Sequence, residues 1–169
     1  MSAMQYFPEQ KAISLNPIFI IEGYAYSQEH IEDFREREVY LESAAGEKVV
    51  LELKDILKGR MNLTQAIFKP LTRLSPNTRY YLKISAPTRE DQLKEFTDYF
   101  NREKDKYETV YWETSEIENT ELLNPTMDIV FKDTQVKFYG CGPAAYAVFK
   151  VSGNKEQVWY RTEMEDLKT

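Results

Sequence analysis

Short alternating segments, separated by turn residues, run through most of this chain and restrict what it can fold into. The clearest is residues 79–85, RYYLKIS, where Tyr80, Leu82 and Ile84 share one face of an extended segment. Comparable segments, rich in the aromatic and β-branched residues that favour strands, are found elsewhere in the chain. They are residues 17–24, 39–43, 47–53, 64–70, 107–116, 128–140, 144–152 and 156–164. Short strands separated by frequent turns predict an all-β fold of the sandwich type.

Two stretches depart from the strand pattern. Residues 27–38 are polar and charged, and we expect a loop or a helical turn there. Within the charged residues 88–105, apolar residues recur at helical spacing, which predicts an amphipathic helix over residues 89–101. The apolar stripe of that helix consists of Leu93, Phe96, Tyr99 and Phe100.

The strand at residues 79–85 follows a distinctive turn. Leu74, Pro76, Thr78 and Tyr80 stand at steps of two in the run LTRLSPNTRYYLKI. This run resembles the corner before a late strand in immunoglobulin-like and fibronectin type III-like sandwiches, where the chain crosses between sheets. The resemblance implies that Tyr80 is a buried ring and that its hydroxyl bonds to backbone near residues 74–77.

Other segments extend the resemblance to bacterial immunoglobulin-like domains over roughly residues 6–116. They are PEQKAISLNPIFIIEG, AIFKPLTRLSPNTRYYLKIS and VYWETSE. The polar stretch at 27–38 and the expected helix at 88–105 are insertions relative to that pattern. We therefore expect an immunoglobulin-like β-sandwich with a short helical insert over residues 3–116. A smaller or truncated β-module is expected over residues 117–169.

The charge of the chain limits its partners. Its formal net charge is −6, whereas nucleic acids and anionic membranes select basic surfaces. No apolar run approaches the roughly 18 residues of a membrane-spanning helix. We expect neither a nucleic-acid partner nor a membrane span.

Residues capable of catalysis are sparse. His30 is the only histidine and stands among carboxylates in QEHIEDFRE, and Cys141 is the only cysteine, in YGCGPAAY. A metal site at His30 or a nucleophile at Cys141 lacks recognisable partners, so a solvated loop and a buried structural residue are the favoured interpretations. Signatures of nucleotide, calcium and serine-hydrolase sites are missing. We expect no metal, no cofactor and no enzymatic activity.

Aromatic residues are abundant, with 12 Tyr, 9 Phe and 2 Trp. On a strand, adjacent rings point to opposite faces, so Tyr111-Trp112 and Trp159-Tyr160 each direct one ring away from its own core. Tyr111, Trp112, Trp159 and Tyr160 form the candidate ligand surface. The alternative interpretation is that they pack in cores and cross-strand ladders.

These features predict a non-catalytic binding or structural module, of the spacer or adhesion type, in a bacterial envelope or secreted protein. Its partner is expected to be a protein or a glycan at the cell surface. One alternative is a carbohydrate-binding module that uses exposed Tyr and Trp, and a less favoured one is a small hydrolase. The first residues, MSAMQYFPEQ, lack the features of a signal peptide, which leaves a cytoplasmic location as the alternative.

Overall fold

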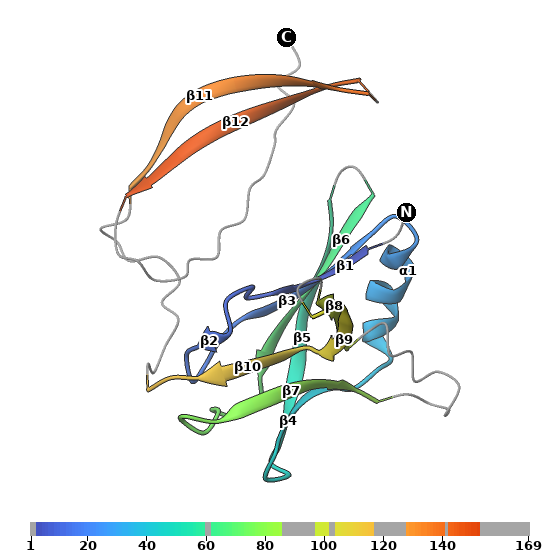
Figure 1. Cartoon of the computed structure of the whole chain (residues 1–169), viewed down its shortest axis with the longest axis vertical. Coiled ribbons are helices and arrows are strands. Elements are labelled where there is room, and N and C mark those ends of the chain that lie inside the picture. Colours follow the sequence, from blue (N-terminus) through green and yellow to red (C-terminus); the bar gives the residue numbers. More distant parts are fainter. Residues whose placement is uncertain are drawn as a thin grey trace. The chain divides into compact units, whose positions relative to one another are not determined.

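A computed structural model describes residues 3–59, 62–85, 97–101, 104–116, 128–140 and 142–152. The chain divides into two compact units, residues 1–119 and 120–169. Strands dominate the secondary structure, with one short α-helix and a single 3₁₀ turn among the described residues (Figure 1). The predicted all-β class with a short helix is therefore confirmed.

In the first unit the strands predicted at 17–24, 39–43, 64–70 and 79–85 are found close to those bounds, and the one predicted at 47–53 extends to residue 58. The segment predicted at 107–116 is divided into two strands, and the strands at 3–7 and 98–101 were not predicted. The ten described strands are β1 (Ala3–Phe7), β2 (Ala12–Ile13), β3 (Phe19–Tyr24), β4 (Val39–Ser43), β5 (Lys48–Lys58), β6 (Leu63–Pro70), β7 (Arg79–Ile84), β8 (Asp98–Asn101), β9 (Lys106–Thr109) and β10 (Tyr111–Thr114). Eight of them form one sheet in the order β1-β3-β6-β5-β4-β7-β10-β2. Neighbours are antiparallel except β10 and β2, which are parallel.

This sheet curls over on itself. Phe19 on β3 and Trp112 on β10 lie on strands separated by four others in the sheet, yet their ring centroids are 4.7 Å apart. Such a contact requires the two halves of the sheet to face each other across a shared core. The fold is thus compatible with a β-sandwich, as the strand pattern predicted.

Alternation along the strands builds that core. Val39, Leu41, Tyr80 and Leu82 are buried, whereas the residues between them on β4 and β7 are partly exposed. The register pairs Leu41 with Leu82, which places both on the inner face of adjacent strands. Burying one apolar face of every strand is the main stabilising contribution expected of such a sheet.

The corner before β7 is formed as predicted. Tyr80 is fully buried, and its hydroxyl oxygen accepts a hydrogen bond from the backbone N–H of Ser75 at 3.0 Å. Leu74 is buried as well, and its N–H donates to the carbonyl of Leu15 at 2.9 Å. The large ring fills the core while its polar tip satisfies the turn backbone.

The short helix lies within the polar stretch for which a loop or helical turn was expected. Helix α1 (Ser27–Glu32) continues into a 3₁₀ turn, η1 (Asp33–Arg35). Ile31 and Phe34 are buried by this segment, so its apolar residues join the core cluster. Because a Cβ at Gly23 would lie 2.6 Å from Cγ1 of Ile31, only glycine lets β3 approach α1 this closely.

The helix predicted over residues 89–101 is wrong where the structure describes it. Residues 98–101 form β8, which pairs with β9 in an antiparallel hairpin. Tyr99 and Phe100, expected on one helical stripe, point to opposite faces of a strand, and the Phe100 ring contacts that of Tyr107 across the hairpin. Cross-strand pairing, which depends on the later residues 106–109, overrides the local helical spacing. Residues 86–96 lie outside the described part.

The second unit is described as one long hairpin. Strands β11 (Asp128–Tyr139) and β12 (Gly142–Ser152) pair antiparallel, close to the predicted strands at 128–140 and 144–152. The predicted strand at 156–164 lies outside the described residues. In neither unit do the described residues contain a helix that is long and apolar enough to cross a bilayer.

Candidate functional site

The predicted ligand surface is split by the structure. Tyr111 and Trp112 are neighbours on β10, but their rings lie on opposite faces of the curled sheet. Trp159 and Tyr160 lie outside the described residues. The pairing of an inward ring with an outward one therefore holds for β10, where Tyr111 is the ring on the outer face.

Trp112 is a core residue. Its side chain is only 1% exposed, and its indole N–H donates to the carbonyl of Pro8 at 2.8 Å. With the ring packed against Phe19 and the polar edge satisfied, Trp112 has no free face for a ligand. It does not belong to an exposed surface, because alternation on β10 directs it inward.

Tyr111 lies on the outer face among cations. The ammonium of Lys11 lies 4.6 Å from its ring centroid, and the guanidinium carbon of Arg79 lies 4.7 Å from it. Arg79 Nε also donates to Glu113 at 2.8 Å, which fixes the guanidinium on the strand pair β7–β10. A sugar ring that stacks on Tyr111 must compete with these cation–π contacts.

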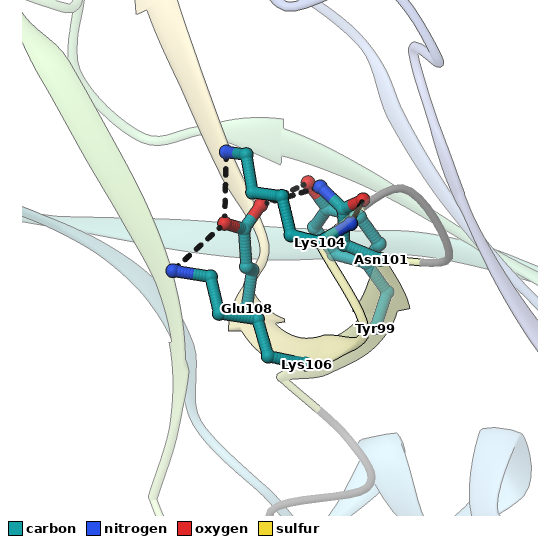
Figure 2. Close-up of polar contacts among 5 residues, drawn as sticks. All are labelled: Tyr99, Asn101, Lys104, Lys106 and Glu108. Atoms are coloured by element: carbon teal, nitrogen blue, oxygen red, sulfur yellow. Dashed lines mark hydrogen bonds and ion pairs between the residues drawn. The ribbon is translucent and has the colours of Figure 1, made fainter.

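A charged cluster adjoins this face on the β8–β9 hairpin. Figure 2 shows Glu108 at its centre, with neighbours from both strands and the turn between them. The Glu108 carboxylate accepts hydrogen bonds from Asn101 Nδ2 at 2.9 Å, Lys104 Nζ at 3.0 Å and the Tyr99 hydroxyl at 3.2 Å. Lys106 Nζ lies 3.4 Å away. We call these five residues the Glu108 cluster.

The hydrogen bonds of the Glu108 cluster stabilise the ionised form of its carboxyl group. The bonds from Asn101 and Lys104 lower the pKa of Glu108 to about 2, so the carboxylate is ionised at neutral pH. Burial lowers the pKa of the nearby Lys11 ammonium, and the negative charge of Glu108 opposes part of that decrease. A general acid or base needs a pKa near the working pH, and Glu108 is far from it.

The two catalytic candidates of the sequence are not brought together within the described residues. His30 is a partly exposed residue of α1, and Cys141 lies outside the described part. No group of three or more His, Cys, Asp or Glu side chains in the described ranges is arranged to hold a metal ion.

A surface groove of about 390 Å³ lies at the end of β6. Its lining residues are Asn16, Glu52, Lys54, Lys69, Pro70, Leu71, Thr72 and Arg73. Glu52 forms an ion pair with Lys54, which neutralises part of the positive charge. The lining residues are polar or charged apart from Pro70 and Leu71.

The most unusual surface lies on the second unit. In the β11–β12 hairpin, Phe131 pairs with Phe149 and Thr134 pairs with Ala147. Cross-strand partners share a face, and the Phe131 and Phe149 ring centroids are 5.8 Å apart. We call the surface formed by these residues and the next outward positions the apolar face. Its described members are Phe131, Thr134, Val136, Phe138, Ala147 and Phe149.

A β-bulge creates this face. Phe131 and Val136 are five residues apart and would lie on opposite faces of a regular strand. The register shifts between Phe131 and Asp133, which removes one residue from the alternation and returns Val136 and Phe138 to the side of Phe131. Lys137 and Tyr146 instead meet on the opposite face, where the ammonium lies 5.9 Å from the ring centroid.

Four large side chains of the apolar face are open to solvent. Phe131 is 55% exposed, Val136 60%, Phe138 82% and Phe149 51%. The opposite face is mixed, because Val130 (50% exposed) and Tyr146 (42% exposed) lie on it together with Asp133, Gln135, Lys137 and Lys150. Exposed apolar groups gathered on one face of a hairpin are a feature typical of contact surfaces.

Sequence reasoning identified both strands of this hairpin but not its exposed face. The local pattern does not reveal the bulge, because residues 129–131 (IVF) are all apolar and therefore set no phase for the residues that follow. Comparisons with protein-family models, curated proteins and solved structures found no match to this chain.

Proposed function

We propose that this chain is a non-catalytic protein-binding module and that the apolar face of the β11–β12 hairpin is its working surface. The observation that carries the proposal is the exposure of Phe131, Val136, Phe138 and Phe149 on one side of the ribbon. Removing such groups from water provides about 25 cal/mol for each Å² of apolar surface buried. A protein partner with a complementary apolar patch gains most from that surface.

The contacts within the first unit support a structural role for that unit. Its rings and charges are engaged with one another, as in the Glu108 cluster and the contacts of Tyr111 with Lys11 and Arg79. A rigid, internally paired sandwich is suited to spacing or presenting another surface. Its Tyr80 corner supports assignment to the immunoglobulin-like class. A bacterial envelope or secreted location follows only from the sequence resemblance.

Carbohydrate binding is the weaker alternative. Stacking on sugars needs open aromatic planes, whereas Trp112 is buried and two cations approach the ring of Tyr111. A small hydrolase has less support still, since Glu108 is held ionised by its hydrogen-bond donors.

The proposal is tested by affinity capture with matched variants of the full chain. Phe138→Asp places a charge on the apolar face, and Lys137→Glu places one on the opposite face of the same strand. We expect some proteins to be retained by the wild type and by Lys137→Glu but not by Phe138→Asp. Each of these proteins is then purified and its binding is verified directly. Equal retention by all three proteins, or none by any, contradicts the proposal.

A parallel assay addresses glycans. Tyr111→Ala and the wild type are titrated with soluble polysaccharides while tryptophan fluorescence is followed. We expect no saturable change in either protein. Saturable binding that Tyr111→Ala abolishes supports the carbohydrate alternative instead.

A further inference from the structure

The surface groove at the end of β6, which we call the β6 groove, is rich in hydrogen-bond donors. Five of its lining side chains carry N–H or O–H groups: Asn16, Lys54, Lys69, Thr72 and Arg73. The two lysines and the arginine donate without accepting. Glu52 is the one lining side chain that only accepts when ionised. A ligand that satisfies this lining must therefore offer mainly acceptor atoms, as an oxyanion does.

The formal charge of the β6 groove is opposite to that of the chain. Two lysines and one arginine stand against one glutamate, which leaves the lining at +2, whereas the whole chain carries −6. At physiological salt, charges are screened over about 8 Å, so a group inside the groove interacts with the lining more strongly than with distant carboxylates. The β6 groove therefore attracts anions locally, although the molecule as a whole is acidic.

The lining carboxylate does not cancel this positive charge. Glu52 forms an ion pair with Lys54, and the register of β5 and β6 places Lys69 opposite Glu52 on the neighbouring strand. One carboxylate beside two ammonium groups leaves positive charge uncompensated. Asp55, the next carboxylate along β5, lies outside the lining, and its oxygen accepts the N–H of Ile56 at 2.8 Å.

Backbone hydrogen bonds hold the wall of the β6 groove in place. The N–H of Leu71 donates to the carbonyl of Val50 at 2.9 Å, and the N–H of Leu74 donates to the carbonyl of Leu15 at 2.9 Å. These bonds fix the segment after β6 to β5 and to the loop that carries Asn16. A ligand then meets a site that is already formed, and its binding does not have to order a loop.

The size of the β6 groove and its apolar residues define the rest of the ligand. Leu71 is 59% exposed, and Pro70 precedes it in the lining. The volume of about 390 Å³ lies within the range of small-molecule sites, roughly 300–1,000 Å³. A long polyanion such as a nucleic acid would extend beyond the groove over a chain that repels it. Size and charge together favour a small organic anion.

We propose that the β6 groove binds a small organic anion whose phosphate or carboxylate group is held by Lys54, Lys69 and Arg73. The apolar part of the ligand contacts Leu71. The groove belongs to the first unit and the apolar face to the second, so this inference goes beyond the proposed function and does not depend on it.

Titrations followed by proton–nitrogen NMR test the β6 groove with three probes built on one ring. Phenyl phosphate and benzoate carry the two candidate oxyanions, and benzamide is the neutral counterpart of benzoate. We expect saturable shifts of the amides along the groove with at least one anion and none with benzamide. The tighter of the two anions identifies the group that is recognised. Benzamide binding as tightly as benzoate, or no saturable shift with either anion, contradicts the proposal.

Matched charge variants test whether the lining holds the anion. Lys69→Gln removes a lining cation and is expected to weaken binding of the anionic probe about fivefold. Lys83→Gln removes a cation of β7 that is not in the lining, and its dissociation constant is expected to stay within about twofold of the wild type. Equal dissociation constants for these two variants overturn the assignment.

Glu52→Gln provides a test that loss of the fold cannot mimic. Removing the lining carboxylate makes the β6 groove more positive, so the anionic probe is expected to bind about threefold more tightly. Weaker binding by a variant with an unchanged NMR spectrum contradicts the electrostatic basis of the site.

Phe138→Asp separates this inference from the proposed function. This variant is expected to bind the anionic probe like the wild type, because Phe138 lies on the second unit. Loss of anion binding in Phe138→Asp would place the ligand on the hairpin and overturn the β6 groove as its site. Absence of anion binding in the wild type, with protein capture by the apolar face intact, overturns this inference and leaves the proposed function standing.

Discussion

The hydroxyl of Tyr80 donates a hydrogen bond to Oε2 of Glu47 over 2.7 Å, while the same oxygen accepts the N–H of Ser75. Ser75 Oγ also donates to the Glu47 carboxylate, at 3.1 Å. The corner before β7 is thereby tied to the turn between β4 and β5. Burial and the Glu47 bond raise the pKa of Tyr80, so the phenol keeps its proton to higher pH than a free tyrosine does.

Tyr80→Phe removes that junction without changing the ring. The Ser75 N–H loses its partner, and we expect a destabilisation of about 1–2 kcal/mol. Urea unfolding measures the change. Tyr26→Phe is the matched control, because Tyr26 is 78% exposed and its substitution should stay within about 0.5 kcal/mol of the wild type. Equal effects of the two variants would be incompatible with the corner described.

Trp112→Phe tests whether the Trp112 ring on β10 points into the core. The smaller ring loses the hydrogen bond to Pro8 and leaves space beside Phe19. A loss of about 2–4 kcal/mol in the free energy of unfolding is expected from the combined cavity and hydrogen bond. A change below about 0.5 kcal/mol would place Trp112 at the surface and reopen the predicted ligand surface.

Gly23→Ala tests the close approach of β3 and α1. The added methyl would lie 2.5 Å from the carbonyl oxygen of Ser27 and 2.6 Å from Ile31 Cγ1, so the helix must shift. We expect a destabilisation of about 1–3 kcal/mol, measured by thermal or urea unfolding. Gly140→Ala is the control, since its methyl meets no atom within 4 Å. If Gly23→Ala unfolds like the control, α1 is not packed as described.

The Glu108 cluster makes a prediction about pH. The folded carboxyl has a pKa of about 2, below the ordinary value of 4.5. Folding therefore gains stability from Glu108 above pH 4.5, and that gain is lost as the pH falls towards 2. Carbon NMR of the Glu108 carboxyl should give a midpoint near 2. Asn101→Ala should raise that midpoint, because Asn101 is the largest cause of the shift. A wild-type midpoint near 4.5 would contradict the cluster.

The sequence predicted the strands whose pattern is local. Residues 39–43 and 79–85 alternate cleanly, and the structure places β4 and β7 there with Leu41 and Leu82 buried. The Tyr80 corner was also predictable, since four residues in a short run define it. Its bond to Glu47 was not, because Glu47 precedes Tyr80 by 33 positions.

Sequence reasoning failed where distant partners decide the structure. Tyr99 and Phe100 fit a helical stripe as well as a strand, and pairing with β9 settles the choice. The apolar face was missed for a similar reason. One bulged residue near Phe131 changes which side chains share a face, and simple alternation assigns Val136 to the wrong side.

Hydroxyl-radical footprinting of the ribbon phenylalanines tests the central claim most directly. In dilute solution, Phe131, Phe138 and Phe149 should be oxidised at the rates of exposed rings. Phe19 and Phe68, each 1% exposed, provide the buried reference within the same molecule. Strong labelling of the ribbon with protection of the reference rings is the predicted result. Ribbon phenylalanines as protected as Phe68 would contradict an accessible binding face on the β11–β12 hairpin.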